Sequence, residues 1–291
     1  MEKFNFSVLL PVYINDEAEN FKAAVSSLLK QTLRPAQIVI VRDGPVELQI
    51  EEYLRSLEQD HAEIEIIRIQ QNIGLGAALN SGLKKCKYEW VIRADSDDIN
   101  IEFRLASIAK IISIKPDIDI ISSEITEFQK SDKLETLFKS KNFPKRKVPQ
   151  DDLSIKKLMD FKNPINHMAV AFKKNIILNS GGYKEMRYFE DYYLWLRARK
   201  NGANFYNIQE SLVYARAGAD MIARRSGLSY AKFEFNFFVH CLKEKLISSK
   251  AIITWIFLRI PSRLLPKNLI YFLYNFFMRQ TQKSPASTLL K

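Results

Sequence analysis

The chain has 291 residues, 47% hydrophobic and 26% charged, an ordinary globular composition that allows one large α/β domain, alone or with a helical tail. Its two cysteines, Cys86 and Cys241, lack metal-ligand spacing and indicate a reducing compartment. The first residues lack a signal-peptide pattern and no stretch reaches about 18 uninterrupted apolar residues, so we expect neither a secretory signal nor a membrane-spanning helix.

Strand and helix patterns alternate through the first third of the chain. Apolar runs typical of buried strands are followed by segments with apolar residues at helical spacing. The expected strands are 6–12, 37–41, 64–69 and 90–92, and the expected helices are 16–31, 46–57 and 75–86. This alternation predicts an α/β fold with a Rossmann-like, mostly parallel sheet covered on both faces.

The pattern is less regular beyond Asp98. We expect a helix over 103–114, a strand over 118–124, a second apolar strand over 168–172, and a helix over 192–200 opened by Glu190 and Asp191. Residues 130–149 form a basic, polar loop, for which a lid and a plain surface insertion are both open interpretations. Trp195 is expected in the core.

An acidic cluster, Asp95, Asp97 and Asp98, follows the strand expected at 90–92. Clustered carboxylates repel one another and are costly to bury. A bound Mg²⁺ or Mn²⁺ removes both costs, since these ions take carboxylate oxygens together with substrate phosphates. The cluster therefore suggests a metal–diphosphate site. A solvated acidic turn that caps the next helix is the alternative, and the rest of the chain has to decide between them.

Further polar residues follow other expected strands. Tyr13 and Glu17 come after the first strand, and Asp43 comes after the second. The carboxyl ends of strands are where open α/β sheets bind ligands, so these residues are expected on one rim with the acidic cluster.

Five motifs together resemble family 2 glycosyltransferases of the GT-A fold, nearest to the exopolysaccharide, amylovoran and O-antigen branch. The motifs are Pro11-Val12-Tyr13, Arg42-Asp43-Gly44, Asn72-x-Gly74-x-x-x-Ala78-x-Asn80-x-Gly82, Asp95-Ser96-Asp97-Asp98, and Gly181-Gly182-Tyr183 leading to Glu190-Asp191. They span about residues 6–202 in the family's order.

The resemblance implies roles for individual residues. The nucleotide-binding residues would be Pro11, Tyr13, Glu17, Asp43, Asn72 and Asp95. Asp97 would ligate Mn²⁺ or Mg²⁺, with Asp95 near the ribose or the metal's water, and Asp98 would be either a partner of the ligands or a helix cap. Asp191 would be the catalytic base of an inverting transfer, with Glu190 beside it; the alternative is that the pair only caps its helix.

Other positions carry open alternatives. His167, Arg216, Arg224 and Arg225 are candidate contacts to acceptor or diphosphate; a structural histidine and an exposed basic face are the other interpretations. Leu79 stands where many relatives carry Arg, so one base-pocket contact is missing or supplied elsewhere. The Q-x-x-R-W signature of processive synthases is absent, which favours transfer of one sugar.

We expect a transferase domain over 1–223 and a helical tail over 224–291. The tail holds 12 of the chain's Lys and Arg against 2 Glu, a net charge of +10 within the total of +11, alongside apolar, aromatic runs. That mixture favours an anionic membrane surface over a core-packing tail or nucleic acid.

The predicted function is transfer of a sugar from a nucleotide donor, expected to be a UDP-sugar, to a lipid-diphosphate-linked saccharide. The predicted place is the inner face of the cytoplasmic membrane. The alternatives are a sugar nucleotidyltransferase, against which the Gly-free, acidic segment after the first strand argues, and a non-catalytic membrane- or nucleic-acid-binding protein.

Overall fold

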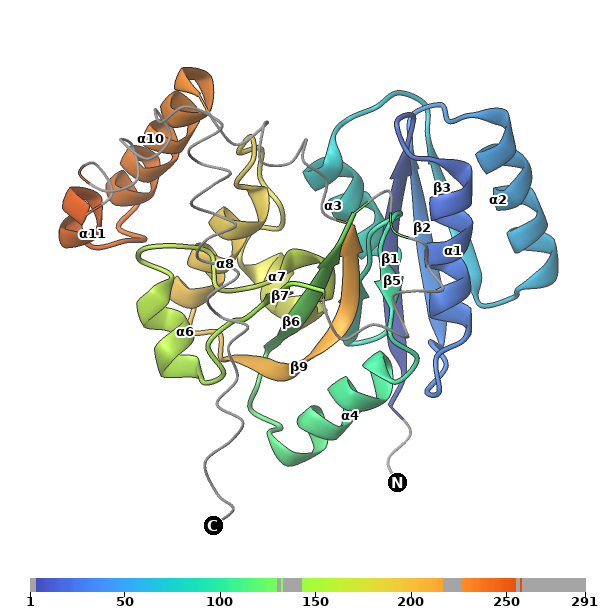
Figure 1. Cartoon of the computed structure of the whole chain (residues 1–291), viewed down its shortest axis with the longest axis horizontal. Coiled ribbons are helices and arrows are strands. Elements are labelled where there is room, and N and C mark those ends of the chain that lie inside the picture. The colour runs from blue at the N-terminus through green and yellow to red at the C-terminus, as the bar shows by residue number, and fades with distance from the viewer. Residues whose placement is uncertain (1–3, 130–131, 133–142, 217–226, 255–256, 258–291) are drawn as a thin grey trace, which may run out of the picture. The chain divides into compact units, whose positions relative to one another are not determined.

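The computed structural model describes residues 4–129, 132, 143–216, 227–254 and 257 (Figure 1). The chain divides into two compact units, Met1–Arg216 and Ala217–Lys291. Several predicted features lie outside the described residues. They are Arg224, Arg225, most of the loop expected at 130–149, and nearly all of the apolar, basic segment after Thr254.

Four parallel strands form one half of the sheet in the first unit. They are β1 (Phe6–Tyr13), β2 (Gln37–Asp43), β3 (Ile64–Ile69) and β4 (Trp90–Arg93), in the spatial order β3-β2-β1-β4. Every neighbouring pair is parallel. The four strands predicted from apolar runs are therefore confirmed, with ends that differ by at most two residues.

Helices cover both faces of these strands because successive strand residues point to opposite sides. Val8 and Leu10 pack in one core with α1 (Ala18–Leu29), α2 (Leu48–Asp60) and α4 (Arg104–Ile114). Leu9 faces α3 (Leu75–Lys85) on the other side. A Cβ at Gly82 of α3 would lie 2.3 Å from Leu9 Cδ1 and 2.6 Å from Val41 Cγ2, so this glycine lets α3 lie directly on the sheet.

The other half of the sheet is mixed. Its strands are β5 (Ile99–Asn100), β6 (Ile120–Phe128), β7 (Lys145–Arg146), β8 (Ala171–Lys173) and β9 (Phe205–Arg216). β8 pairs antiparallel with β4 and β6, whereas β6 and β9 are parallel. β5 pairs antiparallel with the end of β9, and β7, inside the segment expected to be a loop, pairs with β6.

Several local predictions need correction in this half. The strand expected over 168–172 is a 3₁₀ turn, η1 (His167–Ala169), followed by the three-residue β8, because a short apolar run is buried equally well by a turn. The helix predicted to open at Glu190 is confirmed as α8 (Glu190–Lys200). Two short helices, α6 (Asp152–Leu158) and α7 (Lys174–Asn179), and the whole of β9 were not predicted.

The second unit contains α10 (Leu228–Lys243) and α11 (Ser249–Thr254) among its described residues. In α10, Phe237, Phe238 and Cys241 are buried, while Leu228 and Phe235 are exposed. In the described parts of both units, no helix is long and apolar enough to cross a membrane.

Candidate functional site

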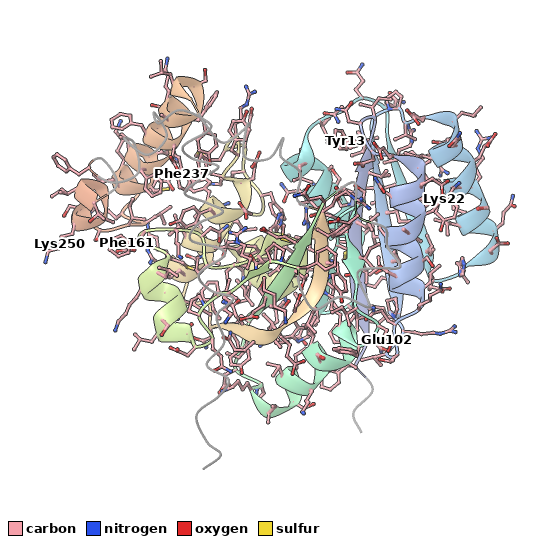
Figure 2. The ribbon with its side chains drawn as sticks, in the orientation of Figure 1. Tyr13, Lys22, Glu102, Phe161, Phe237 and Lys250 are labelled. Atoms are coloured by element: carbon pink, nitrogen blue, oxygen red, sulfur yellow. The ribbon has the colours of Figure 1, made fainter. Side chains whose placement is uncertain are left out.

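The carboxyl ends of β1, β2 and β4 bring the predicted nucleotide-binding residues to one rim of the sheet. Tyr13 is directly opposite Asp43 in the β1–β2 register, and Pro11 is opposite Val41. Leu9 pairs with Arg93, so Asp95 follows immediately beyond the end of β4. Tyr13 lies at this end of the strands (Figure 2), and it is 40% exposed.

Asp43 organises the turn that enters α3. Its Oδ1 accepts the backbone N–H of Ile73 at 2.8 Å, and its Oδ2 accepts that of Gly74 at 3.1 Å. The side chain of Asn72 donates to the Asp43 carbonyl at 3.2 Å. At Gly44, with φ of +81°, a Cβ would lie 2.7 Å from Asn72 N. Asp43 and Asn72 are thus brought together, and Asp43 is buried but held in a fixed orientation.

One contact of Glu17 joins it to α1. It is exposed at the start of α1, and its Oε2 accepts from Asn20 of the same helix at 2.9 Å.

Two arginines contact the acidic cluster, one at the end of β4 and one at the end of β9. Arg93, buried at the end of β4, forms a two-pronged ion pair with Asp95. Arg216, the last residue of β9, donates its backbone N–H to Asp98 Oδ1 at 2.8 Å and its Nε to the Asp97 carbonyl at 3.3 Å. The Arg216 guanidinium also lies over the Phe128 ring at 4.6 Å. The structure therefore places Arg216 beside the acidic cluster.

Asp98 does not cap a helix. It precedes β5, and the residue before the first turn of α4 is Phe103. The carboxylate of Asp98 instead accepts the backbone N–H of Arg216 and so joins the end of β9 to the acidic cluster. The helix-cap interpretation is therefore wrong.

Asp16 is a fourth carboxylate of this cluster and was not singled out from the sequence. It follows β1, accepts the Tyr13 N–H at 2.9 Å and hydrogen-bonds the Ser96 side chain. Burial, with the charges of Asp97 and Asp95, raises the pKa of Asp16 to about 7. Its position one residue before Glu17 gives no sequence signal that would separate it from an ordinary loop aspartate.

Asp97 and Asp98 are both buried, and each lies near other negatively charged carboxylates. Burial and the Asp95 charge raise the pKa of Asp97 to about 6, and burial raises the pKa of Asp98 well above its ordinary value. Asp95 is neutralised by the Arg93 fork, whereas Asp97 lacks such a fork among the described contacts. The donor set thus fits a hard cation bound mainly through Asp97. The described residues form no closed group of three or more metal-ligating side chains, so phosphate oxygens would have to complete the coordination.

The predicted catalytic pair lies at the first turn of α8. Asp191 Oδ2 accepts the side-chain N–H of Asn163 at 2.7 Å, and Oδ1 accepts the backbone N–H of Tyr192 at 2.7 Å. Burial raises the pKa of Glu190. A Cβ at Gly76 would lie 3.9 Å from Glu190 Cγ, so the first turns of α3 and α8 are neighbours. Asn163 is not among the site residues predicted from the sequence, and the structure gives it Asp191 as a partner.

His167 and Tyr183 form a buried pair. His167 Nε2 lies 2.9 Å from the Tyr183 hydroxyl, and burial together with the Arg93 charge lowers the pKa of His167 well below its usual value. Burial raises the pKa of Tyr183, with smaller contributions from Asp191 and Asp95. A Cβ at Gly76 would lie 3.3 Å from Tyr183 Cβ, so Tyr183 lies beside the first turn of α3.

Asn80 fixes Tyr183 in place through its backbone. The Asn80 amide donates to the Tyr183 carbonyl at 2.7 Å and accepts the Tyr183 N–H at 2.8 Å. Leu79 beside it is fully buried, and Trp195 is a core residue as predicted. The motif asparagine thus joins α3 to the turn before α8.

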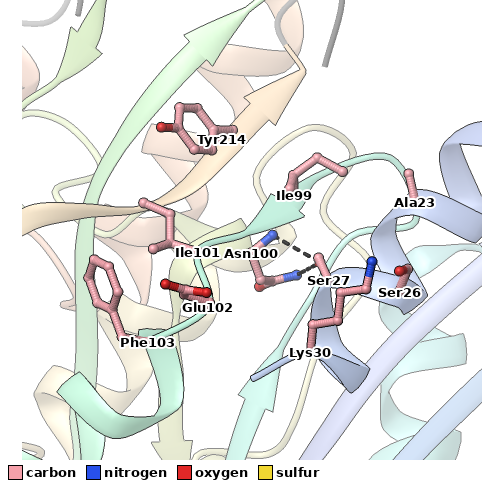
Figure 3. A pocket seen from close by; sticks show the side chains of 10 residues that line it. All are labelled: Ala23, Ser26, Ser27, Lys30, Ile99, Asn100, Ile101, Glu102, Phe103 and Tyr214. Atoms are coloured by element: carbon pink, nitrogen blue, oxygen red, sulfur yellow. Dashed lines mark hydrogen bonds between the residues drawn. The ribbon is translucent and has the colours of Figure 1, made fainter. Parts of the chain in front are cut away.

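A cavity of about 570 Å³ lies elsewhere, between α1 and the β5–α4 segment (Figure 3). Its lining residues are Ala23, Ser26, Ser27, Lys30, Ile99, Asn100, Ile101, Glu102, Phe103 and Tyr214. Glu102 lies at the opposite end of the parallel strands from Tyr13 (Figure 2). None of the predicted site residues lines this cavity, so the candidate site is the rim and not the cavity.

The sequence of the chain is similar to those of known bacterial glycosyltransferases. The chain is 37% identical over 275 residues to the UDP-Gal:alpha-D-GlcNAc-diphosphoundecaprenol beta-1,3-galactosyltransferase of Escherichia coli, covering 94% of this chain and 97% of that protein. It is 33% identical over 272 residues to the amylovoran biosynthesis glycosyltransferase AmsE of Erwinia amylovora, covering 92% and 97%. These relatives confirm the predicted branch.

Solved structures show the same fold at low sequence identity. Staphylococcus aureus TarS in complex with UDP-GlcNAc has a TM-score of 0.63 at 18% identity, covering 87% of this chain and 73% of that chain. The mannosyltransferase PcManGT of Pyrobaculum calidifontis, in complex with GDP-Man and Mn²⁺, has a TM-score of 0.62 at 14% identity, covering 98% and 76%.

The pattern of the family described as Glycosyl transferase family 2 matches residues 7–173, more than half of the chain. That match selects glycosyl transfer over the nucleotidyltransferase and non-catalytic alternatives. The chain belongs to glycosyl transferase family 2.

Proposed function

We propose that this glycosyltransferase moves one sugar from a UDP-sugar to a lipid-diphosphate-linked saccharide, with inversion at the anomeric carbon and with a divalent cation. The observation that carries the proposal is the position of the first turn of α3. Asp43 accepts from Ile73 and Gly74 at the entry to this helix, and a Cβ at Gly76 would lie 3.9 Å from Glu190 Cγ. The proposed nucleotide pocket and the proposed catalytic pair therefore adjoin the same turn of α3.

The nucleotide half of the donor is assigned to the rim. Tyr13 offers an exposed ring for the base, and Asp43, fixed by Ile73 and Gly74, retains lone pairs that can accept the N3–H of uracil. The E. coli relative is named for a UDP-Gal donor, which supports uridine. Pro11 and Asn72 shape the same pocket through the β1–β2 register and the turn before α3.

The diphosphate is assigned to the acidic cluster and Arg216. Asp97 would hold Mn²⁺ or Mg²⁺, and Asp95, already paired with Arg93, would take ribose hydroxyls or the water around the cation. The chemistry that a bound cation supplies is neutralisation of the charge that develops on the leaving diphosphate. Arg216, held against Asp97 and Phe128, contributes a fixed positive charge on the same side.

Proton transfer is assigned to Asp191. An ionised carboxylate at the start of α8 takes the proton from the acceptor hydroxyl as that oxygen attacks the anomeric carbon. The helix N-terminus favours this negative charge. Glu190, whose pKa is raised by burial, is less readily ionised and therefore less suited to the task.

The acceptor is assigned to the inner membrane surface. The E. coli relative is named for a diphosphoundecaprenol acceptor, a lipid. The second unit exposes Leu228, Phe235, Ile253 and Phe257, by 43% to 77%, on a segment that also carries Lys232, Lys243, Lys245 and Lys250. Exposed apolar side chains with lysines match what an interfacial segment requires.

Calorimetric titration of UDP, GDP and ADP, with Mn²⁺ and then with EDTA, tests the donor assignment. We expect UDP to bind selectively and to lose affinity in EDTA. Metal-independent binding would remove the cation from the proposal, and binding of none of the three nucleotides would overturn the donor assignment.

Two matched substitutions separate the roles of the carboxylates. Asp97→Asn is expected to weaken UDP binding in Mn²⁺ and to abolish transfer to a lipid extract. Asp191→Asn is expected to leave UDP binding intact and to lower transfer by at least about 10²-fold. Near-normal transfer by Asp191→Asn would show that the base has been assigned wrongly.

A further inference from the structure

We propose that Asn163 is the positioning residue of Asp191, holding the proposed base in one orientation and in its ionised form. This inference rests on the proposed function, since it deepens the role given to Asp191. Its basis is the 2.7 Å hydrogen bond from Asn163 Nδ2 to Asp191 Oδ2, which joins residues 28 positions apart.

The direction of this hydrogen bond is fixed by a second contact. Asn163 Oδ1 accepts the backbone N–H of Ile165 at 3.1 Å, so the oxygen of the amide faces its own loop. The NH₂ group must then face Asp191. Pro164 also restricts Asn163 to an extended backbone, which limits the ways in which the side chain can turn away.

The loop that carries Asn163 is anchored on two sides. The Pro164 carbonyl accepts from Asn207 Nδ2 at 3.1 Å, which ties the loop to β9. Asn166 donates to the Ser123 carbonyl at 2.8 Å, and the Asn166 carbonyl accepts the Ser122 hydroxyl at 3.0 Å, which ties it to β6. Asn163 is therefore presented from a rigid support, as precise positioning of a reacting group requires.

The chemistry of an amide donor suits a base. A donated N–H stabilises the ionised carboxylate over the protonated one, and it cannot itself take the proton. The titratable groups whose charges interact with Asp191 are Glu190, next to it on α8, and Tyr183, on the preceding turn. An ionised Glu190 opposes negative charge on Asp191, whereas burial keeps Tyr183 neutral. The amide of Asn163 favours the ionised form of Asp191 and adds no charge of its own.

The test measures kcat against pH, with a UDP-sugar and a lipid acceptor extract, for Asn163→Ala and Asn163→Asp. Asn163→Ala is expected to lower kcat by about 10- to 100-fold, the range for a lost hydrogen bond to a charged group, and to move the acidic limb of the profile to higher pH. Asn163→Asp places two carboxylates within hydrogen-bond distance, and these cannot both ionise freely. Its acidic limb should move further, with transfer partly recovered at high pH.

The matched control is Asn166→Ala, three residues along the same loop. Asn166 is buried and anchors the loop to β6 through hydrogen bonds with Ser122 and Ser123. This change is expected to lower the unfolding temperature without moving the acidic limb. UDP affinity should be unchanged in both Asn163 variants, which also shows that they are folded.

The outcomes distinguish this inference from the proposed function. If Asp191→Asn abolishes transfer while neither Asn163 variant moves the acidic limb, the positioning role is overturned and the base assignment stands. If Asp191→Asn transfers normally, the base assignment itself fails. If Asn163→Ala does not fold, Asn163→Asp decides the question, because it keeps the size of the side chain and the Oδ1 acceptor for Ile165.

Discussion

Residues 6–93 and residues 94–216 form the two halves of one sheet by different means. In the first half, the four strands are apolar runs that pair in parallel with one another, and β1, β2 and β3 are each followed by a helix. In the second half, strands of two to twelve residues pair in both directions, and single side chains fix the connections. The first half thus supplies a scaffold through hydrophobic packing, while the second supplies site residues through specific hydrogen bonds.

The largest expected effect comes from Arg93, which links the halves by holding Asp95. Arg93→Met removes both prongs of the fork and leaves Asp95 uncompensated beside Asp16, Asp97 and Asp98. We expect kcat/KM for sugar transfer to fall by about 10²- to 10³-fold, equivalent to about 3 to 4 kcal/mol. Steady-state kinetics with a UDP-sugar measures this.

Arg68→Met is the control for Arg93. Arg68 makes a similar fork with Glu58, with both distances at 2.8 Å, but on an exposed part of the first half. Exposed ion pairs contribute little, so transfer should be unaffected. Equal losses in the two variants would mean that Arg93 acts on stability alone.

Asp16 gives the next largest effect, on stability. Its pKa is about 7 in the folded protein against an ordinary value of 3.8, so between these pH values the folded state holds a proton that the unfolded chain has released. Its stabilising contribution is therefore full below about pH 4 and is lost as pH rises through about 7, by on the order of a few kcal/mol. Urea unfolding in EDTA from pH 4.5 to 8 should show this loss.

Asp16→Asn isolates that contribution. The difference in unfolding free energy between wild type and variant is expected to change across this pH range, with the wild type losing more as pH rises. A difference that does not depend on pH would contradict the raised pKa. Added Mn²⁺ should stabilise the wild type most at high pH, where the carboxylates are ionised.

Asn80 has a smaller effect, at the join between the halves. Asn80→Ala leaves the backbone N–H and carbonyl of Tyr183 without these partners, for an expected loss of about 2 to 4 kcal/mol in unfolding free energy. Transfer should fall as well, because Tyr183 and α8 are held by this contact. Chemical denaturation and transfer assays on one preparation measure both, and a stable variant with full activity would disprove the link.

Gly82→Ala tests packing within the first half alone. The added methyl would press on Leu9 and Val41, with an expected cost of about 1 to 3 kcal/mol. UDP affinity per folded molecule should be unchanged, since Gly82 lies away from the rim. A specific loss of UDP binding would show that the scaffold and the site are less separate than we infer.

This division explains what the sequence could predict. β1 to β4 and their helices were predicted because a buried strand needs a continuous apolar run, such as residues 37–41, and a covering helix needs apolar residues at helical spacing. The rim followed from those strands, since Tyr13 and Asp43 are the last residues of β1 and β2, and Asp95 lies two residues beyond the end of β4.

The remainder carries no periodic signal. Asp98 accepts from Arg216, Asn163 donates to Asp191, and Asn80 binds Tyr183, at separations of 118, 28 and 103 residues. Such pairs depend on three-dimensional placement, so neither the partner of Asn163 nor the participation of Asp16 could be derived from spacing. The two-residue β5 is too short for an apolar pattern to reveal.

The contact between Asp98 and Arg216 has a consequence for the order in which the protein matures on the ribosome. The strands and helices of residues 6–93 can pair as soon as they emerge, but Arg216 is synthesised 118 residues after Asp98. At about 5 to 20 residues per second, the carboxylates would wait roughly 6 to 24 seconds for that partner. A nascent chain of this protein would therefore gain its scaffold well before it could gain an assembled diphosphate site.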